Sequence, residues 1–353
     1  MLTESLDVVD FVVNKGNGVR GLAEMGLQSV PNQYVQPVEE RIDGAKVVSD
    51  ESIPIIDVSS WDDPTVTDSI CVASRKYGFF QIINHGIPTE VLEKVQAAAH
   101  RFFEMPMEDK IKYKRDLAAS GTAKLGTSFS PGKEKVMEWK DYLSLQYFTE
   151  GIAAVDWPPI CKNEALNYAK MVEVLVRKIY HVLLKGLNLK SFDKTKESLL
   201  MSWIAVNFNY YPYCPNPDLT VGVGRHSDGS ALTVLLQDDV GGLLVRAPDR
   251  CSWIHVPPTK GALVINIGDI LQLLSNGIYK SIEHMVVTNQ RKTRVSIAIF
   301  INPAPHQVVA PLPELLEISG EKPLYREIVF IDYFKYFISK GHDGKATIEW
   351  AKI

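Results

Sequence analysis

Beyond about residue 200, hydrophobic and polar residues alternate with a period of two in short segments that turn-forming residues separate. This period places successive side chains on opposite faces, as in a strand with one buried face. No helical pattern interrupts the series, which is typical of an antiparallel sandwich or barrel. The predicted strands are 203–211, 231–237, 243–246, 252–256, 262–267, 279–287 and 294–301.

The first 200 residues combine helical patterns with short strands. Val172, Leu175 and Ile179 recur at steps of three and four, as expected for one face of a helix. The predicted helices are 65–76, 89–103, 164–187 and, near the C-terminus, 331–339; the predicted strands are 53–58 and 78–85. Residues 114–135 indicate a long loop or a weak hairpin, and the first 50 residues indicate short helices without a core of their own.

Composition excludes several classes of protein. Hydrophobic residues make up 46% and charged residues 23% of the 353, and the net charge of −4 gives no basic footprint for nucleic acid. No apolar run approaches the roughly 20 residues of a membrane span, and no signal-peptide pattern is present. The four cysteines form no CxxC pair, which favours reduced thiols in a cytoplasmic protein. No nucleic-acid, membrane or obligate protein partner is expected.

A metal site is the chemistry that the strand-rich half indicates first. His226 and Asp228 are two residues apart, so on a strand they face the same way, and His284 lies in a later predicted strand. Two histidines and one carboxylate, with coordination positions left open, form the facial triad of non-haem Fe(II) oxygenases. Alone the pattern is weak, because His-x-Asp is a common tripeptide and His284 could be an ordinary strand histidine.

A carboxylate-binding pair follows ten residues after His284. Arg294 and Ser296 share a strand face, and a planar guanidinium beside a hydroxyl suits the far carboxylate of a dicarboxylate co-substrate. Asn209 and Tyr211 also share a face, and a polar face toward a barrel interior is unfavourable unless it serves a ligand. The alternatives are a surface ion pair for Arg294 and a plain strand end for Tyr211.

Taken in order, the motifs resemble those of the plant 2-oxoglutarate/Fe(II)-dependent dioxygenases. The runs concerned are Ile53-Pro-Ile-Ile-Asp, Gly78-Phe-Phe-Gln-Ile-Ile-Asn-His-Gly, Asn209-Tyr-Tyr-Pro-Tyr-Cys-Pro, Gly224-Arg-His-Ser-Asp, Asn276-Gly-Ile-Tyr-Lys-Ser-Ile-Glu-His and Arg294-Val-Ser. The resemblance implies a mainly β fold with flanking α-helices around a distorted double-stranded β-helix, or jelly-roll. It divides the chain into an N-terminal helical extension (1–50), an N-terminal dioxygenase region of mixed strand and helix (51–198), the jelly-roll core (199–305) and a C-terminal helical segment (306–353).

The resemblance also implies roles and cofactors. The positions that match iron ligands are His226, Asp228 and His284, and those that match 2-oxoglutarate contacts are Arg294, Ser296, Tyr211 and Asn209. The family uses Fe(II), 2-oxoglutarate and O2, with ascorbate as a supporting reductant, and needs no catalytic residue beyond the metal centre. Met285 departs from the pattern, since many relatives carry Arg there; because it faces away from His284 on a strand, iron binding should persist.

Further motifs resemble the hydroxycinnamoyl-CoA ortho-hydroxylases. They include Gly126-Thr-Ser-Phe-Ser-Pro, Glu138-Trp-Lys-Asp-Tyr-Leu-Ser, Trp253-Ile-His-Val-Pro-Pro and His342-Asp-Gly-Lys. The resemblance implies ring hydroxylation of feruloyl-CoA, p-coumaroyl-CoA or both, leading to coumarins such as scopoletin or umbelliferone. Two alternatives stay open: a hydroxylase of a free coumarin, similar to scopoletin 8-hydroxylases, or of another phenolic, and a jelly-roll that binds a phenolic without oxidising it.

Substrate contacts can be nominated only from residue type and position. The aromatic candidates are Phe129, Phe300, Tyr333 and Phe334, although each could equally be a core residue. A basic rim for CoA phosphates could be formed by Lys124, Lys133, Lys135 and Lys140, although a solvated charged loop is the simpler interpretation. His85 is expected in a structural turn, and the remaining histidines, His342 among them, have no partner at metal-ligand spacing.

Overall fold

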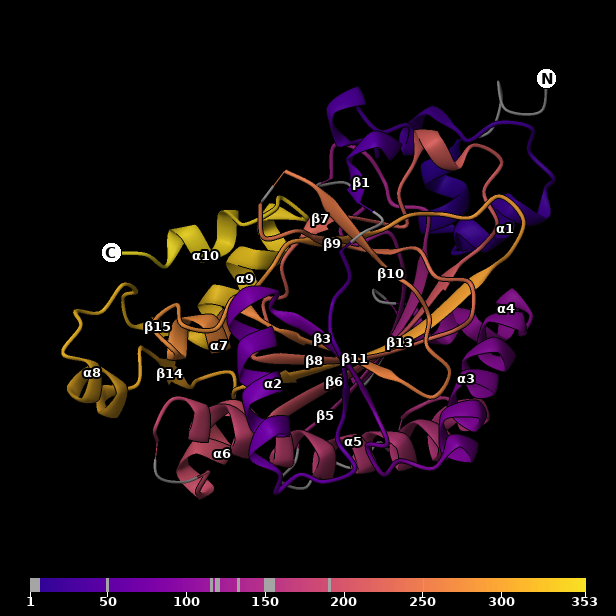
Figure 1. Ribbon diagram of the computed structural model, residues 1–353. Coiled ribbons are helices and arrows are strands. Elements are labelled where there is room, and N and C mark those ends of the chain that lie inside the picture. Colours follow the sequence, from indigo (N-terminus) through magenta and orange to yellow (C-terminus); the bar gives the residue numbers. More distant parts are fainter. Residues whose placement is uncertain are drawn as a thin grey trace.

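The computed structural model describes residues 7–48, 51–114, 117, 121–131, 134–148, 156–189, 192–249 and 251–353. Two β-sheets form the centre of the molecule and line one cavity between them. Helices cover the outer face of the larger sheet (Figure 1). Both the 51–198 and the 199–305 segments contribute strands to the larger sheet. The boundaries of the four segments stay predictions.

The larger sheet has eight strands in the order β2-β3-β11-β8-β13-β6-β5-β4. Their bounds are β2 Ile55–Asp57, β3 Phe79–Ile83, β4 Ala123–Thr127, β5 Asp141–Phe148, β6 Trp203–Tyr211, β8 Leu232–Gln237, β11 Leu263–Ile267 and β13 Arg294–Asn302. β6 and β13 pair antiparallel along their whole length, so Arg294 lies opposite Tyr211 and Ser296 opposite Asn209. The register therefore gathers the four predicted co-substrate residues at one end of two neighbouring strands.

The smaller sheet brings two distant histidines together. Its five strands, in spatial order, are β1 Val47–Val48, β10 Trp253–Val256, β9 Leu243–Arg246, β12 His284–Val286 and β7 Val223–His226. β7 and β12 run antiparallel with His226 opposite His284. β12 is shorter than the predicted strand 279–287, because the backbone N–H groups of Lys280 and Ser281 donate outside the sheet, to Ser74 O and Gln272 Oε1.

Three helices pack on the outer face of the larger sheet (Figure 1). They are α2 Pro64–Lys76, α3 Thr89–Glu104 and α5 Pro159–Gly186, which confirm three of the predicted helices. On β6, Val206 and Phe208 are buried in the same core as Ile179 of α5, whereas Asn207 and Asn209 line the cavity between the sheets. The alternation read from the sequence thus separates the hydrophobic core from the cavity.

The remaining elements are shorter. The helices are α1 Gly18–Glu24, α4 Met107–Lys110, α6 Lys194–Leu200, α7 Asp269–Leu274, α8 Pro313–Ser319, α9 Phe330–Lys340 and α10 Ala346–Trp350, and the pair β14 Val308–Val309 and β15 Ile328–Val329 forms a third sheet. α9 confirms the helix predicted at 331–339. In the part of the chain described, no helix has both the length and the apolar character needed to cross a bilayer.

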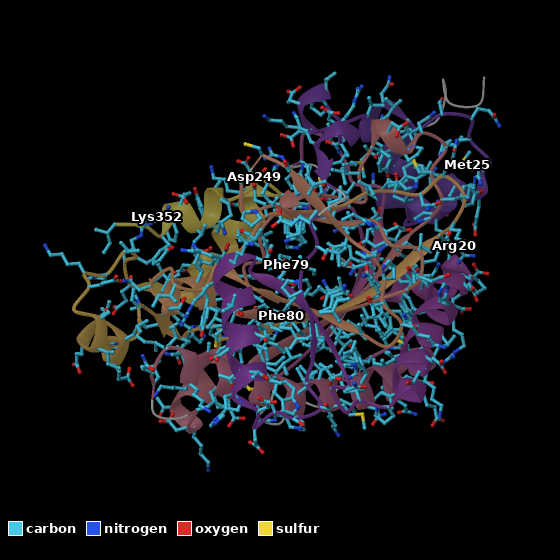
Figure 2. All side chains as sticks on the ribbon, in the orientation of Figure 1. Arg20, Met25, Phe79, Phe80, Asp249 and Lys352 are labelled. Atoms are coloured by element: carbon cyan, nitrogen blue, oxygen red, sulfur yellow. The ribbon has the colours of Figure 1, made fainter. Side chains whose placement is uncertain are left out.

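Phe79 and Phe80 are adjacent residues of β3 (Figure 2) and point to opposite faces of the larger sheet. Phe80 is buried in the core beneath the helices, whereas Phe79 lines the cavity and meets the His284 ring edge to face, with ring centroids 5.1 Å apart. Phe79 therefore fixes the orientation of one predicted metal ligand. His85, just after β3, does not contact the predicted metal ligands. Its Nε2 donates a hydrogen bond to Gly261 O at 2.9 Å, as expected for a histidine in a structural turn.

The N-terminal segment packs against the start of β5 and the residues just before it. Val12, Val19 and Tyr34 share a buried cluster with Trp139, so this segment has no separate core. Asp141 at the start of β5 accepts hydrogen bonds from the backbone N–H groups of Val19 and Arg20, at 2.8 and 2.9 Å. The first turn of α1 is therefore tied directly to β5.

Candidate active site

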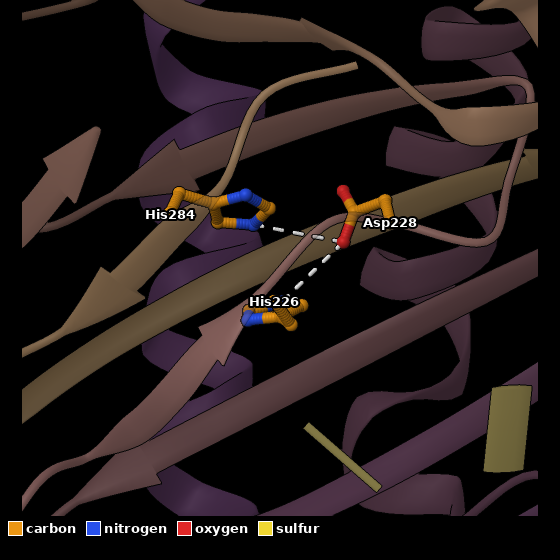
Figure 3. A group of neighbouring side chains, drawn as sticks. All are labelled: His226, Asp228 and His284. Carbon is orange, nitrogen blue, oxygen red and sulfur yellow. Dashed lines mark ion pairs between the residues drawn. The ribbon is translucent and has the colours of Figure 1, made fainter. Parts of the chain in front are cut away.

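Three predicted metal ligands converge at the edge of the smaller sheet (Figure 3). The Nε2 atoms of His226 and His284 lie 3.5 and 3.6 Å from Oδ1 of Asp228, and all three residues are buried. His226 ends β7 and His284 begins β12, whereas Asp228 lies in the loop just beyond β7. The backbone N–H of Asp269 donates to Asp228 O at 2.8 Å and holds this loop in place.

The protonation states suit a divalent cation. The Nδ1 atoms of His226 and His284 donate to Gly224 O and Ile282 O, at 2.8 and 3.2 Å, which leaves each Nε2 with a lone pair directed at Asp228. Burial and His226 lower the pKa of His284 to about 4, and burial also lowers the pKa of His226. Burial raises the pKa of Asp228, but His284 and His226 outweigh it and hold that pKa well below its usual range. Two lone pairs and a carboxylate that converge without a shared proton fit a metal ion.

The second oxygen of Asp228 is held by protein groups. Thr233 Oγ1 and Asn266 Nδ2 donate to Asp228 Oδ2 at 2.6 and 2.8 Å. These bonds orient the carboxylate so that Oδ1 faces the histidines. Partners of this kind, one step removed from the metal, tune the affinity of the site for its ion.

Thr233→Val is expected to weaken iron affinity about 10- to 100-fold, since valine keeps the shape of threonine and removes one donor to Asp228. Titration of the metal-free protein with Fe(II) under anaerobic conditions would measure the change. The matched control is Thr288→Val, because Thr288 is buried beside Cys214 and does not contact the carboxylate. Equal iron affinities for the two variants would contradict the assigned role of Thr233.

A buried guanidinium lies in the same cavity as the three ligands. Arg294 is 2% exposed; its Nη1 donates to Ser296 Oγ at 3.0 Å, and its plane lies over the Tyr211 ring with 5.0 Å to the centroid. Its Nε atom has no hydrogen-bond partner within the described residues. A buried cation with an unused donor, beside a hydroxyl and the amide of Asn209, fits a carboxylate of 2-oxoglutarate.

One cavity of about 190 Å³ joins the metal ligands, the Arg294 group and a mainly aromatic chamber. Three of the four aromatic candidates, Phe129, Phe300 and Phe334, line it, and their contact with substrate stays a prediction. Tyr333 is not among the residues that line it: its hydroxyl donates to buried Asp269 at 2.8 Å and its ring is buried in the main core, which supports the core alternative for this residue. Among the lining residues that sequence reasoning did not nominate are Phe337 and His342, and Lys140, nominated for the rim, lines the cavity itself.

Comparison with known proteins identifies the family. Residues 204–303 match the model of the 2OG-Fe(II) oxygenase superfamily, and residues 53–163 match that of the non-haem dioxygenase in morphine synthesis N-terminal region. Feruloyl CoA ortho-hydroxylase F6H1-3 of Ipomoea batatas is 55% identical, covering 98% of this chain and 97% of the relative. The bi-functional coumaroyl CoA and feruloyl CoA ortho-hydroxylase F6H2-2-1 of the same species is 56% identical, with the same coverage.

The chain belongs to the 2OG-Fe(II) oxygenase superfamily. A crystal structure of JOX2 in complex with 2OG, Fe and JA superposes on this oxygenase with a TM-score of 0.85 at 34% identity, covering 95% of this chain and 97% of JOX2. The predicted jelly-roll with flanking helices is therefore confirmed. The protein is an enzyme that uses iron and 2-oxoglutarate, as predicted, and the alternative of a jelly-roll that binds a phenolic without oxidising it is not supported.

A buried polar cluster of the oxygenase adjoins the metal ligands. The ring of His342 stacks on that of His226, with centroids 4.2 Å apart, and its Nδ1 donates to Glu138. Glu138 also lies 3.0 Å from the Lys140 Nζ and accepts from the backbone N–H of Gly224 at 2.7 Å. Burial raises the pKa of Glu138, but His342 and Lys140 outweigh it and hold that pKa well below its usual range. Burial lowers the pKa of Lys140, but Glu138 outweighs it and raises that pKa, so both groups are charged at neutral pH.

The three described lysines of the suggested basic rim, Lys124, Lys135 and Lys140, differ in their exposure to solvent. Lys140 is buried and lines the cavity, Lys124 is half-buried on β4, and Lys135 is exposed. Lys133 lies outside the described residues. Met285 packs with Leu244 and Trp253, away from the cavity, as the alternation of β12 predicts.

Proposed function

We propose that this oxygenase hydroxylates the aromatic ring of hydroxycinnamoyl-CoA thioesters at the carbon ortho to the side chain. The supporting observation is full-length identity of 55–56% to enzymes named as feruloyl CoA and coumaroyl CoA ortho-hydroxylases. These names favour a CoA thioester over a free coumarin. The chamber lined by Phe129, Phe300 and Phe334 suits an aromatic ring held beside the metal ligands.

In this proposal His226, Asp228 and His284 hold iron, and Arg294, Ser296, Asn209 and Tyr211 hold 2-oxoglutarate. Iron held by these residues would supply the redox chemistry, in which oxidative decarboxylation of 2-oxoglutarate by O2 gives succinate and CO2 and one oxygen atom enters the ring C–H bond. The protein orients both substrates: Arg294 fixes the distal carboxylate, and the aromatic chamber excludes water around the ring. The ortho-hydroxylated thioester then isomerises and lactonises, and its new hydroxyl displaces CoA to give the coumarin.

An aerobic assay with Fe(II), ascorbate and 2-oxoglutarate tests this function. Feruloyl-CoA, p-coumaroyl-CoA and free scopoletin are offered separately, and products are resolved by mass. We expect scopoletin from feruloyl-CoA or umbelliferone from p-coumaroyl-CoA, with succinate formed in step. Product from free scopoletin alone, or succinate without any of these products, would contradict the thioester proposal.

We also infer that the enzyme acts in the cytoplasm. Its four cysteines, Cys71, Cys161, Cys214 and Cys251, are all unpaired, and the last is exposed. Free thiols at such positions persist in a reducing compartment. Cell fractionation with a compartment marker would test this inference, and recovery of the enzyme in a secretory fraction would contradict it.

A further inference from the structure

The buried cation Lys140 has no role in the chemistry described so far. It directly precedes β5, is 6% exposed and lines the cavity. Its ammonium group forms a short ion pair with Glu138, 3.0 Å away, and Glu134 interacts with it from a longer distance. An ammonium group carries three N–H donors, and buried donors are normally all satisfied. The ion pair with Glu138 uses at most part of these three donors, and Lys140 lines the cavity. A ligand in the cavity can therefore accept a hydrogen bond from the remaining N–H groups.

The position of this ammonium group is fixed relative to the metal ligands. Glu138 holds Lys140 on one oxygen and binds His342 and the backbone N–H of Gly224 through the other. Gly224 belongs to β7, which ends at His226, and the His342 ring stacks on the His226 ring. Lys140 is thus linked through short contacts to the strand that presents the first metal ligand.

The co-substrate does not require this second cation. Arg294 and Ser296 already suit its distal carboxylate. Its keto-acid end would bind iron held by His226, Asp228 and His284. The remaining ligand of the cavity is the aromatic thioester. Its phosphate and amide acceptors are far from the ring, and the acceptors close to the ring are the thioester carbonyl oxygen and the phenolic oxygen. The target carbon is adjacent to the ring carbon that bears the side chain, whereas the phenolic oxygen lies at the opposite end of the ring. A donor near the metal ligands therefore reaches the side chain more readily than the phenol.

We propose that Lys140 donates a hydrogen bond to the thioester carbonyl oxygen of the substrate and thereby presents the ortho carbon to the metal centre. This inference rests on the proposed function and names the residue that selects the site of hydroxylation. Glu138 and His342 are positioning residues in this arrangement, because they act on the substrate through Lys140.

Lys140→Met tests the proposal, since methionine fills similar space without a donor. With feruloyl-CoA we expect kcat/KM to fall about 10- to 100-fold, as for loss of a charge-assisted hydrogen bond. The ratio of hydroxylated product to succinate should also fall, because a ring held less firmly leaves more 2-oxoglutarate turnover uncoupled. The 2-oxoglutarate concentration for half-maximal succinate formation should stay unchanged.

A substrate analogue makes the test specific for the carbonyl group. The S-(hydroxycinnamyl)-CoA thioether lacks that oxygen and keeps the ring, the phenol and the CoA. With the thioether, kcat/KM for hydroxylation should be the same for wild type and for Lys140→Met. In the variant, kcat/KM should also be the same for the thioether and the thioester. A wild-type advantage over the variant that persists with the thioether would overturn the carbonyl assignment.

Two further proteins control for loss of a buried charge. Lys110→Met removes a lysine that is 7% exposed and bonds Phe103 O, outside this cavity, so the product-to-succinate ratio should match wild type. Lys140→Met combined with Glu138→Gln removes both charges, so it should fold and still show the low ratio. A normal ratio in either Lys140 variant, or a raised 2-oxoglutarate requirement, would overturn the inference. Failure of wild type to hydroxylate feruloyl-CoA would instead refute the proposed function itself.

Discussion

Asp228→Asn is expected to abolish iron binding and hydroxylation while the iron-free fold survives. Asparagine can keep its carbonyl oxygen where Thr233 and Asn266 donate to Asp228 Oδ2. Its NH₂ group then occupies the position of Oδ1 and donates toward the Nε2 lone pairs of His226 and His284, 3.5 and 3.6 Å away. The variant therefore satisfies its own polar groups and presents hydrogens where a cation would lie. The loss of iron affinity should exceed the roughly 10- to 100-fold change typical when a residue that hydrogen-bonds to a metal ligand is replaced.

Thermal unfolding with and without Fe(II), under anaerobic conditions, separates iron binding from folding. A ligand that binds the native state alone raises Tm as its concentration exceeds Kd, so wild type should show an iron-dependent rise and Asp228→Asn none. Asp239→Asn is the matched control, since the Asp239 side chain is 86% exposed, and its iron-dependent rise should match wild type. An equal rise in Asp228→Asn would show that Asp228 is not a ligand.

Much of the fold followed from the alternation of residues along single segments. β6 and β9 have the predicted bounds, and β13 extends one residue beyond its prediction. The strand β5 was missed, because its sequence Asp-Tyr-Leu-Ser-Leu-Gln-Tyr-Phe follows a stretch dense in Gly, Ser and Lys that favoured a loop over residues 114–135. β5 owes its strand conformation to pairing with β4 and β6. Such partners come from distant parts of the chain, which a local pattern does not contain.

The grouping of the three proposed metal ligands was predictable from the sequence, whereas the residues packed around them were not. His226, Asp228 and His284 form a pattern of residue types at fixed spacing, and the structure brings them together. His342 was set aside because it has no partner at metal-ligand spacing, yet an isolated bridge between His226 and Gly344 places its ring on His226. Lys140 looked like a surface charge in a lysine-rich stretch. In the structure Lys140 is buried, pairs with buried Glu138 and lines the cavity, which the sequence pattern does not reveal.

Arg294→Met is expected to raise the 2-oxoglutarate requirement strongly without changing iron binding. The guanidinium is 2% exposed, so its loss would leave the distal carboxylate of 2-oxoglutarate buried beside Ser296 without a counter-charge. Removal of one partner of a buried charged pair typically costs about 2–5 kcal/mol. This corresponds to an increase of roughly 30-fold or more in the 2-oxoglutarate concentration for half-maximal succinate formation. Arg294→Lys should lie between wild type and Arg294→Met, since lysine keeps the charge and loses the planar fork.

Two readouts distinguish loss of the co-substrate contact from general damage to the site. The iron-dependent rise in Tm should persist in Arg294→Met, because Arg294 contacts Ser296, Gln237 and Tyr211 and none of the proposed iron ligands. Arg291→Met removes an exposed arginine just before β13, and its 2-oxoglutarate requirement should match wild type. If Arg294→Met saturates at the wild-type 2-oxoglutarate concentration, the anchor for the distal carboxylate must be sought elsewhere in the cavity. If it also loses the iron-dependent rise, the substitution has disturbed the metal site, and the two subsites are not independent as proposed.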